Sequence, residues 1–369
     1  MRIGFDAKRA FYNKTGLGNY SRDLLRALFS FFPEEEYVLF TPTKGKFYNP
    51  LEDAQVITAP LLLRGKASVL WRTFFLPASL KKAKIDIFHG LTNELPFGLK
   101  KLNIKKLVTI HDLIFLRYPE FYNSADTLIY KKKVLYACAI ADKIIAVSTQ
   151  TKEDLVNLLN VPEEKIHVIY QDCHECFQIP VNKEFAASIR EKYHLPPQFI
   201  LSVGTLEQRK NQLSILKALT ELPEEFKLVL VGKDNEYKEI LAGFIKKHQL
   251  QKRVLMLENV PFYDLPAMYY LAKVFAYPSI FEGFGIPILE AMNIGVPVVT
   301  SKGSCFAETA GEAAMYVSPG DFKQLAEAIK KVWDNVLLSA EMVEKGFEQA
   351  KKFRKEKNIN ALINIYRSL

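Results

Sequence analysis

Long apolar runs, cysteines and low-complexity tracts are scarce in this sequence, and each scarcity excludes a class of protein. The uncharged apolar runs fall far short of the ~20 residues that a membrane-spanning helix requires. Four cysteines in 369 residues are too few and too scattered for a disulfide framework, which is consistent with a reducing compartment. With 17 glycines and 18 prolines, the composition is neither collagen-like nor typical of Pro/Gly-rich disorder. We therefore expect a soluble globular protein.

The first residues also lack the apolar core and the small-residue cleavage site of a signal peptide. Met1–Asp6 instead has the pattern of a strand that carries charge. We expect the protein to remain in the cytoplasm.

The pair Cys173 and Cys176 has the spacing of a redox motif or of half a zinc site. A redox pair opens a helix after a strand, and zinc requires four ligands. The sequence contains no second CxxC or HxxxH that would complete a metal site. We therefore expect structural loop cysteines here.

The chain length predicts two domains, because ordinary domains contain roughly 150 residues. Short β-branched segments alternate with longer amphipathic ones along the whole chain, which is typical of parallel sheets with crossover helices. Two sets of strands are predicted: Arg2–Ala7, Tyr37–Pro42, Gln55–Ala59, Asp86–Gly90, Lys106–His111, Lys143–Ser148 and Lys165–Tyr170, then Phe199–Gly204, Lys227–Gly232, Arg253–Glu258, Val274–Pro278, Pro297–Ser301 and Ala314–Val317. The predicted fold class is α/β, with two doubly wound domains and ligands bound at the carboxyl ends of the strands, in a cleft between the domains.

The domain boundary is predicted near Phe177–Lys183, where the last strand of the first set gives way to a polar stretch that contains a proline. The predicted domains are residues 1–180 and 181–354. The chain ends in basic amphipathic helices, the last of them predicted at Asn358–Ser368.

Most of the net charge of +9 lies in the first 180 residues. Part of it is interleaved with leucines and aromatic residues over 61–66, 71–75 and 81–84, as in basic segments that contact anionic membranes. An amphipathic helix that packs on its own core, with its lysines in water, has the same pattern. Both interpretations stay open, whereas no recognised motif supports binding to nucleic acid.

A glycine pair, Gly16 and Gly18, follows the first strand and precedes a helical pattern at Ser21–Phe29. Such a loop lets backbone N–H groups approach a phosphate at a helix N-terminus, but a plain tight turn has the same sequence. The three-glycine dinucleotide fingerprint is not met, and the second strand ends in Thr41-Pro42 without the acidic residue of that fingerprint.

Two other strand ends carry candidate binding side chains. His111 follows the fifth strand, where a histidine can hydrogen-bond a sugar hydroxyl or stabilise developing positive charge, although a buried histidine bonded to backbone is the alternative. In the second set, the strand ending at Gly204 is followed by Thr205 and then by Arg209 and Lys210. Adjacent Arg and Lys at the start of a helix suit a diphosphate, although a solvated basic pair is the alternative.

The segment Phe281–Met292, which reads FEGFGIPILEAM, is the strongest candidate site. Pro287 suits the first turn of a helix, and the two glycines before it free the backbone to present N–H groups to an anion. Glu282 then lies in the loop before this helix, and Glu290 lies about one turn inside it among apolar residues. Two carboxylates flanking an anion-binding helix end suit a nucleotide sugar, which has hydroxyls on both sides of its phosphates.

The segment Glu282–Glu290 resembles the E-x7-E signature of retaining glycosyltransferases of the GT-B fold, specifically glycosyltransferase family 4. The resemblance extends over the whole chain, through Gly16 and Gly18, His111-Asp112-Leu113, Ser202–Thr205 with Arg209–Asn211, and Gly295–Thr300. It implies two Rossmann-like domains with the nucleotide sugar in the C-terminal one. It also implies a final helix, at about 355–369, that crosses back to the first domain.

The same resemblance implies a role for each site residue. Glu290 would bind the ribose hydroxyls, Glu282 would contact the transferred sugar, and His111 would face that sugar. Arg209 and Lys210 would hold the diphosphate. The donor-binding positions implied in this way also include Gly16, Gly18, Gly204, Thr205, Phe284, Gly285, Ile286 and, for the base, Val260 in the loop 259–262.

Two positions depart from the family pattern. Thr205 stands where many relatives carry Arg, so the diphosphate would depend more on Arg209 and Lys210, or the donor would differ. The segment Cys173–Cys176 stands where relatives often have a Gly-Val-Asp turn, which further favours a structural loop. The sequence contains no Asp-x-Asp motif, and we expect no metal ion or other cofactor because Lys, Arg and a helix dipole can stabilise the leaving group.

The predicted function is transfer of a hexose from a UDP- or GDP-sugar to a hydroxyl of a glycan or lipid-linked acceptor, with retention, in the synthesis of cell-surface polysaccharide. The 204–211 pattern resembles mannosyltransferases and favours mannose. The alternatives are a nucleotide-sugar epimerase or phosphorylase, a non-catalytic nucleotide- or NAD-binding module, and a membrane-attached scaffold. The presence of both Glu282 and Glu290 argues against a degenerate binder, and the missing fingerprint argues against NAD.

Overall fold

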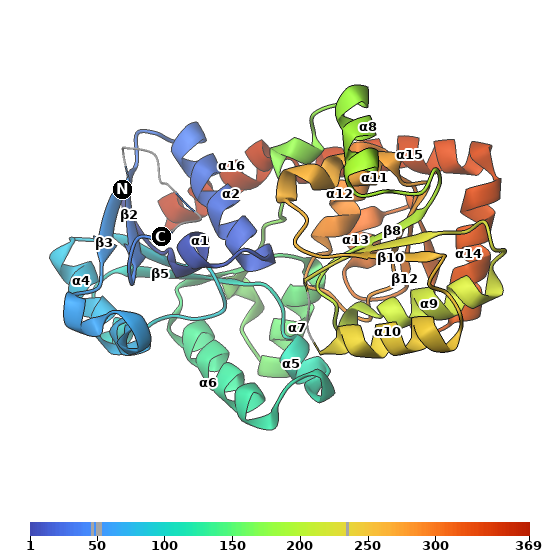
Figure 1. Ribbon diagram of the computed structural model, residues 1–369. Helices are drawn as coiled ribbons and strands as arrows, with labels where there is room; N and C mark the ends of the chain where they lie inside the picture. Colours follow the sequence, from blue (N-terminus) through green and yellow to red (C-terminus); the bar gives the residue numbers. More distant parts are fainter. Residues whose placement is uncertain (46–47, 49–53, 234–235) are drawn as a thin grey trace. The chain divides into compact units, whose positions relative to one another are not determined.

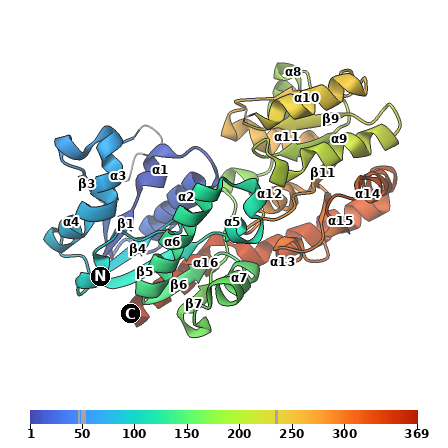
Figure 2. The same cartoon turned by 90° about the horizontal axis from the view of Figure 1, so that it is seen from below.

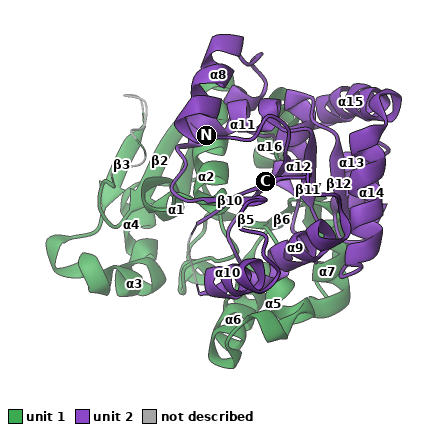
Figure 3. Cartoon of the chain, turned by 45° about the vertical axis from the view of Figure 1, so that its right-hand side comes forward, with its two compact units in different colours: residues 1–171, 354–369 green, residues 172–353 purple. Residues whose placement is uncertain are grey.

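The structure, a computed structural model, describes residues 1–45, 48, 54–233 and 236–369, which form two compact units (Figure 3). Unit 1 comprises Met1–Gln171 and Arg354–Leu369, and unit 2 comprises Asp172–Phe353.

Unit 1 is built on a parallel seven-stranded sheet in the order β3-β2-β1-β4-β5-β6-β7 (Figure 1). Its strands are β1 (Arg2–Asp6), β2 (Glu36–Thr41), β3 (Gln55–Thr58), β4 (Ile87–Gly90), β5 (Lys105–Ile110), β6 (Lys143–Ala146) and β7 (Ile166–Val168). Its helices are α1 (Lys8–Tyr12), α2 (Gly16–Phe31), α3 (Ser68–Leu70), α4 (Leu76–Lys82), α5 (Ile114–Arg117), α6 (Ser124–Ile140), α7 (Thr149–Leu159) and α16 (Lys355–Ser368).

Each face of this sheet has its own apolar core. Successive side chains of a strand point to opposite faces, so that Leu107 of β5 packs in one core cluster and Val108 in the other. The C-terminal helix α16 contributes Ile359, Leu362 and Tyr366, at helical spacing, to the cluster that also contains residues of α1 and α2. This burial explains why the end of the chain belongs to unit 1.

Unit 2 has a parallel six-stranded sheet in the order β10-β9-β8-β11-β12-β13. Its strands are β8 (Ile200–Val203), β9 (Leu228–Val231), β10 (Val254–Leu257), β11 (Val274–Tyr277), β12 (Val298–Ser301) and β13 (Ala314–Val317). Its helices are α8 (Lys183–Lys192), α9 (Gln212–Glu221), α10 (Tyr237–Lys247), α11 (Leu265–Leu271), α12 (Ile286–Ile294), α13 (Phe306–Ala310), α14 (Phe322–Asp334) and α15 (Val336–Ala350).

The predicted α/β class and both sets of strands are confirmed. Each predicted strand is present in the described part of the chain, with ends that differ by two residues or fewer, and all strand pairs are parallel.

The units divide at Gln171–Asp172, nine residues before the boundary predicted after Pro180. The intervening loop packs on unit 2, because the ring of Phe177 contacts Phe262 at 5.6 Å and Tyr269 at 5.7 Å between centroids. These contacts join residues that are far apart in the sequence, so the local composition could not indicate them.

The basic segment 61–84 forms a helical run in which a π-helical turn, Trp71–Phe75, connects α3 to α4. Trp71 and Leu80 are buried in the core of unit 1, so one face of the segment packs as the amphipathic-helix interpretation requires. None of the helices formed by the described residues is long and apolar enough to cross a membrane.

Candidate functional site

The strongest predicted motifs meet at one edge of the unit 2 sheet. The strand order reverses between β8 and β11, which lie side by side with β9 on one side and β12 on the other. Arg209 and Lys210 follow the carboxyl end of β8, and Glu282 follows that of β11. Ligands of open α/β sheets bind at such a switch point, outside the carboxyl ends of the strands.

Glu282 is buried and is held by two cations and two hydroxyl groups. Its Oε2 atom lies 2.8 Å from Arg209 Nη1, and its Oε1 atom lies 2.7 Å from Lys210 Nζ. The hydroxyls of Tyr277 and Ser279 donate hydrogen bonds to Oε1 at 3.0 and 2.5 Å. The three charged groups that were predicted separately therefore form one cluster.

The electrostatics of this cluster follow from its burial and charge. Burial alone would raise the pKa of Glu282, but Arg209 and Lys210 outweigh that effect and lower it to about 2. Burial lowers the pKa of Lys210, and the neighbouring Glu282 opposes that shift. A fixed carboxylate and two fixed cations thus occupy the switch point without needing water to reorganise.

Arg209 and Lys210 retain capacity for a further anion. Lys210 donates to Glu282 and, at 2.6 Å, to the Tyr277 hydroxyl, so the described residues supply acceptors for two of its three N–H donors. Arg209 contacts the Phe281 carbonyl at 2.7 Å and Glu207 at 2.6 Å besides Glu282. Gly204 precedes them with φ +149°, a backbone conformation that favours glycine.

The N-terminus of α12 forms the next part of the site. Gly285 is its N-cap residue with φ +89°, a left-handed conformation that a side chain would strain, and Pro287 occupies the first turn as predicted. The hydroxyl of Thr309 donates to the Phe284 carbonyl, and the Phe284 ring packs on Phe353 at 5.3 Å, which fixes the loop before the helix. The first N–H groups of a helix have no intrahelical partner, so those of Gly285 and Ile286 suit an anion.

Glu290 lies inside α12 and is buried, and the hydroxyl of Tyr269 on α11 donates to its Oε2 atom at 2.9 Å. Burial and the Glu290 carboxylate raise the pKa of Tyr269 well above its ordinary value, so Tyr269 stays a donor. The half-buried Val260 lies in the loop between β10 and α11. The strand β10 is two strands from β8, on the same side of β8 as β9, so this loop follows the carboxyl end of an outer strand of the sheet.

Sequence reasoning missed the residues that orient Glu282. Tyr277 and Ser279 stand at the end of β11, and Ser304 accepts a hydrogen bond from the Glu282 N–H at 3.1 Å. The segment Tyr277-Pro278-Ser279 at the end of an apolar strand was an available signal, because polar side chains at a strand's carboxyl end line the ligand edge. The half-buried Thr205 is nearby in the chain, and its carbonyl accepts from Gln212 Nε2 at 2.9 Å.

Gly16 and Gly18 belong to unit 1, at the start of α2, and have different surroundings. A Cβ atom on Gly18 would lie 1.9 Å from the Asn13 carbonyl oxygen, whereas one on Gly16 would meet nothing within 4 Å. Position 18 therefore requires glycine because the Asn13 backbone passes close to it, whereas there is room for a side chain at position 16.

We expect Gly18→Ala to destabilise unit 1 by about 1–3 kcal/mol, because the loop before α2 must move to admit the methyl group. Gly16→Ala is the matched control and should change the unfolding free energy by less than about 0.5 kcal/mol. Thermal unfolding of both variants measures this. Equal melting temperatures for the two variants would contradict the packing argument.

His111 follows β5 in unit 1 and has the buried, backbone-bonded environment that was the alternative interpretation, while its contact with a sugar stays a prediction. It is buried, its Nε2–H donates to the Leu91 carbonyl at 2.9 Å, and burial lowers its pKa to about 4. The neutral ring leaves Nδ1 as an acceptor, which Gln171 Nε2 approaches at 3.4 Å. Tyr20 of α2 packs edge-on against the ring at 4.6 Å. Since the ring is neutral, its Nδ1 atom suits the hydroxyl of a ligand better than an anion.

A buried ion network at the carboxyl ends of β1 and β4 was also missed by sequence reasoning. Arg72 binds Asp6 at 2.5 Å and Glu94 at 2.7 Å, and Lys133 of α6 binds Glu94 at 2.8 Å. These groups join α6 and the helical run 68–82 to the sheet. No sequence signal links residues so far apart.

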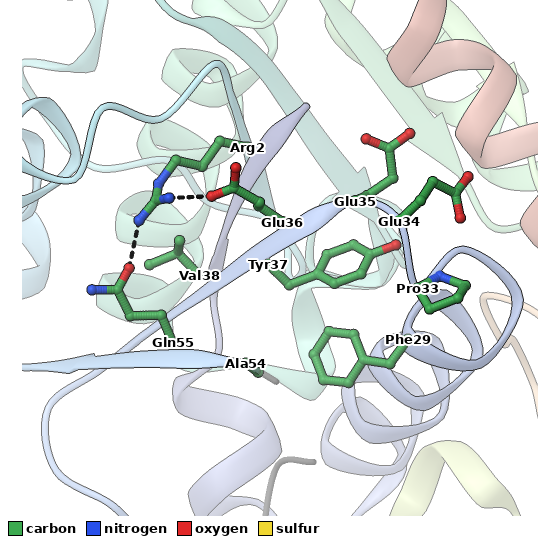
Figure 4. Close-up of a pocket in the computed structure, with 10 residues that line it drawn as sticks. All are labelled: Arg2, Phe29, Pro33, Glu34, Glu35, Glu36, Tyr37, Val38, Ala54 and Gln55. Carbon is green, nitrogen blue, oxygen red and sulfur yellow. Dashed lines mark hydrogen bonds and ion pairs between the residues drawn. The ribbon is translucent and has the colours of Figure 1, made fainter. Parts of the chain in front are cut away.

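The pocket drawn in Figure 4, with a volume of about 380 Å³, lies at the opposite, amino edge of the unit 1 sheet. Its carboxylates are engaged within the chain, because Glu36 pairs with Arg2 and Glu35 with the Met1 amino group. A second cavity, of about 330 Å³, opens between α9 and α10 and is lined by Gln208 and Asn211 of the loop before α9. Only the second lies near the Glu282 cluster.

Neither Cys173 nor Cys176 forms a disulfide bond. Cys173 is buried, and its sulfur accepts from Asn293 Nδ2 at 3.4 Å. Among the residues that the structure describes, no group of three or more His, Cys, Asp or Glu side chains is arranged to hold a metal ion.

Two family models match the chain. Residues 15–171 match Glycosyltransferase Family 4, and residues 186–349 match Glycosyl transferases group 1. The O-antigen chain mannosyltransferase B of Escherichia coli is 30% identical over an alignment of 390 positions that covers all of both chains. The O-antigen chain mannosyltransferase RfbU of Salmonella typhimurium is 31% identical over 229 residues, 61% of this chain and 60% of that protein.

Solved structures show the same fold. Sucrose-phosphate synthase from Thermosynechococcus elongatus has a TM-score of 0.82 and 22% identity, over all of this chain and 98% of that one. Anabaena HepE, in complex with UDP and glucose, has a TM-score of 0.79 and 19% identity over the whole of both chains. The fold is that of the GT-B enzymes, with two Rossmann-like sheets.

Proposed function

Because the chain belongs to glycosyltransferase family 4, we propose that it transfers mannose from a nucleoside diphosphate mannose to a hydroxyl of a glycan or lipid-linked acceptor in polysaccharide synthesis. The chain is a glycosyltransferase, and a relative that matches it over its whole length is an O-antigen mannosyltransferase. The observation that carries the proposal is the buried Glu282 carboxylate held by Arg209 and Lys210 at the switch point of unit 2.

In the proposed reaction, the acceptor oxygen forms a bond to the anomeric carbon while the bond from that carbon to the phosphate oxygen breaks. The departing phosphate oxygen takes the proton of the acceptor hydroxyl, on the same face, which gives retention. Lys210, Arg209 and the N-terminus of α12 stabilise the charge on the leaving diphosphate. Glu290 lies about one turn inside α12 and accepts a hydrogen bond from Tyr269. This position suits a ribose and does not suit the second carboxylate of a double displacement.

The remaining site residues have roles in this proposal that follow their positions. Glu282 accepts hydrogen bonds from the transferred sugar, since its carboxylate stays ionised. Val260 and its loop contact the base, and His111 offers Nδ1 to a sugar hydroxyl. The reaction needs no metal ion, since fixed cations supply the positive charge. The enzyme works in the cytoplasm at the inner face of an anionic membrane, which unit 1 contacts.

We expect GDP to raise the melting temperature of the protein without added metal, and UDP and NAD to have little effect. A ligand that binds only the folded state adds about 2.7 kcal/mol at 100 times its dissociation constant. Glu290→Ala should remove most of this shift, because it deletes the buried carboxylate assigned to the ribose. Thermal scans at equal millimolar ligand concentrations, followed by transfer assays with GDP-mannose, measure both effects.

Glu191→Ala, which removes an exposed carboxylate of α8, is the matched control and should keep the full shift. A shift with UDP alone would mean that the donor is a UDP-sugar instead of a GDP-sugar. A shift with NAD alone would overturn the transferase proposal. Product analysis distinguishes the transferase from a nucleotide-sugar epimerase, because an epimerase would change the configuration of the sugar without any acceptor.

A further inference from the structure

Unit 1 has a switch point of its own. The sheet continues from β1 to β2 and β3 on one side and to β4 on the other, so the strand order reverses between β1 and β4. Figure 2 shows β1, β4, β5 and β6 side by side. Ligands of doubly wound sheets bind at such a point, outside the carboxyl ends of the strands. The cations proposed for the donor diphosphate, Arg209 and Lys210, belong to unit 2, which leaves the switch point of unit 1 for a different ligand.

The guanidinium group of Arg72 is fixed at this switch point. Its Nε and Nη2 atoms donate to Asp6, at the end of β1, at 3.0 and 2.5 Å, and Nη2 also donates to Glu94, which follows β4, at 2.7 Å. The Arg72 side chain is only 12% exposed. Its Nη1 atom has no acceptor among the residues that the structure describes, and it is not fully buried. Two N–H donors of a fixed cation are therefore available to a ligand.

Two further cations, Lys8 and Arg9, follow β1. Both side chains are half-buried, and neither makes a hydrogen bond or ion pair within the described part of the chain. Burial lowers the pKa of Lys8, and the charge of Arg72 lowers it further, while Asp6 opposes the shift. Like charges are thus held near one another, and an anion bound beside them would compensate their repulsion.

The charges at this switch point do not cancel. The cluster contains four cations and two carboxylates, namely Lys8, Arg9, Arg72, Lys133, Asp6 and Glu94. Four minus two leaves an excess of two positive charges, and a phosphate group carries about −1.5 to −2 at pH 7. A guanidinium edge and an ammonium group also match the oxygens of a phosphate. A neutral sugar would leave the excess charge uncompensated, so a phosphate group is the ligand that fits.

We propose that the switch point of unit 1 binds a phosphate group of the acceptor, through Lys8, Arg9 and the Nη1 atom of Arg72. The phosphates of the donor have their own cations in unit 2, so the phosphate bound by unit 1 belongs to the other substrate. The inference rests on the proposed function, because that function supplies the acceptor, and it adds the chemical class of that acceptor. The phosphate belongs either to the diphosphate of a lipid-linked sugar or to a phosphorylated sugar.

His111 connects this site to the sugar of the acceptor. Burial lowers the pKa of His111, and the charge of Arg9 lowers it further, so Arg9 lies near the end of β5 as well as that of β1. The neutral ring offers Nδ1 to a hydroxyl group and is unsuited to a phosphate. A phosphate at Arg9 and a sugar hydroxyl at His111 can therefore belong to one acceptor molecule.

Calorimetric titration of the full chain with geranyl diphosphate tests the inference. The titration contains a saturating concentration of GDP or UDP, whichever raises the melting temperature, so that the donor site of unit 2 is occupied. The unchanged chain should bind geranyl diphosphate and should not bind geraniol. Lys8→Gln/Arg9→Gln should weaken binding about 100-fold, because each charge-assisted contact with a phosphate contributes about a factor of ten. Its melting temperature should change little, since both side chains lack partners among the described residues.

The matched control replaces another adjacent pair of cations in unit 1. Lys100 and Lys101 are exposed and precede β5, at the amino edge of the same sheet. Lys100→Gln/Lys101→Gln should therefore bind geranyl diphosphate as the unchanged chain does. Titration with mannose 6-phosphate distinguishes the two sources of the phosphate. Tighter binding of geranyl diphosphate indicates a lipid-linked acceptor, and tighter binding of the sugar phosphate indicates a phosphorylated one; either result supports the phosphate site if Lys8→Gln/Arg9→Gln weakens it.

Steady-state kinetics test whether the bound phosphate is that of the acceptor. The same acceptor sugar is supplied on geranyl diphosphate and as a methyl glycoside. The unchanged chain should have the lower KM for the diphosphate-linked sugar, and Lys8→Gln/Arg9→Gln should reduce this preference about 100-fold, by the same loss of two charged contacts. The control pair should keep the preference.

The inference is overturned if neither geranyl diphosphate nor mannose 6-phosphate binds, or if Lys8→Gln/Arg9→Gln binds them as well as the control pair does. It is also overturned if Lys8→Gln/Arg9→Gln loses the melting-temperature shift produced by the nucleotide, because these cations would then hold the diphosphate of the donor. Absence of transfer to every acceptor, with geranyl diphosphate still bound through Lys8 and Arg9, would contradict the proposed function and leave the phosphate site standing.

Discussion

Replacing Lys210 with alanine should lower kcat/KM for glycosyl transfer by about 10²–10³-fold while unit 2 remains folded. Lys210 places a buried positive charge at the switch point, and the loss of one such fixed group that stabilises developing charge costs about 3–4 kcal/mol in the transition state. Folding should survive, because Glu282 keeps Arg209 and the hydroxyls of Tyr277 and Ser279. Steady-state kinetics with a saturating acceptor measure the loss.

Lys246→Ala, which removes an exposed lysine from α10, is the matched control and should transfer at the normal rate. Lys210→Arg should recover only part of the activity, since a planar guanidinium does not reproduce a compact ammonium that also bonds to Tyr277. Near-normal transfer by Lys210→Ala would contradict the assignment of Lys210 to the leaving diphosphate.

The strands could be predicted because parallel strands are buried on both faces. Segments such as Leu228–Val231 and Val274–Tyr277 are continuous apolar runs, and each is separated from the next by enough residues for a crossover helix. The same reasoning could not locate the end of unit 1. The loop after Gln171 joins unit 2 through Phe177, which packs against residues about 90 positions away in the chain.

The site could be predicted where its parts are local in sequence. Pro287 after two glycines predicts the start of α12, and that start places Glu282 before the helix and Glu290 inside it. The pairing of Glu282 with Arg209 and Lys210 depends on the adjacency of β8 and β11, which only the strand order provides. Its contacts with Tyr277 and Ser279 depend in addition on the side chains' directions at the end of β11.

The positive charge of unit 1 has a comparable explanation. The sequence pattern of residues 61–84 permitted either a packed helix or a surface that contacts a membrane, and the structure contains a packed face and an exposed one. Periodicity alone could not separate them, because Trp71 and Arg72 turn inward while Phe74 and Phe75 remain outside on the same π-helical turn.

Replacing Glu282 with glutamine should both abolish most transfer and destabilise unit 2 by about 3–5 kcal/mol at neutral pH. Two buried cations would lose the carboxylate that compensates them, and breaking a buried ion pair by removing one partner costs about that much. Hydrogen exchange of the amides in β8 and β11 measures the opening free energy of unit 2 separately from that of unit 1. The exposed carboxylate Glu191 provides the control, and Glu191→Gln should leave exchange and transfer unchanged.

The charge of Glu282 should make the stability difference between the unchanged chain and Glu282→Gln depend on pH. The pKa of Glu282 is about 2 in the folded protein, below the 4.5 of an unperturbed glutamate, so its ionisation stabilises the fold above pH 4.5 and this contribution is lost as the pH falls towards 2. Since each pKa unit corresponds to about 1.4 kcal/mol, about 3 kcal/mol of stability should disappear over this range in the unchanged chain and not in Glu282→Gln. The difference in unfolding free energy between the two proteins should therefore have its neutral-pH value at pH 6 and be much smaller at pH 2.5. A difference that stays constant over this range would mean that the destabilisation comes from altered packing, and that the carboxylate's charge is not what holds Arg209 and Lys210 in place.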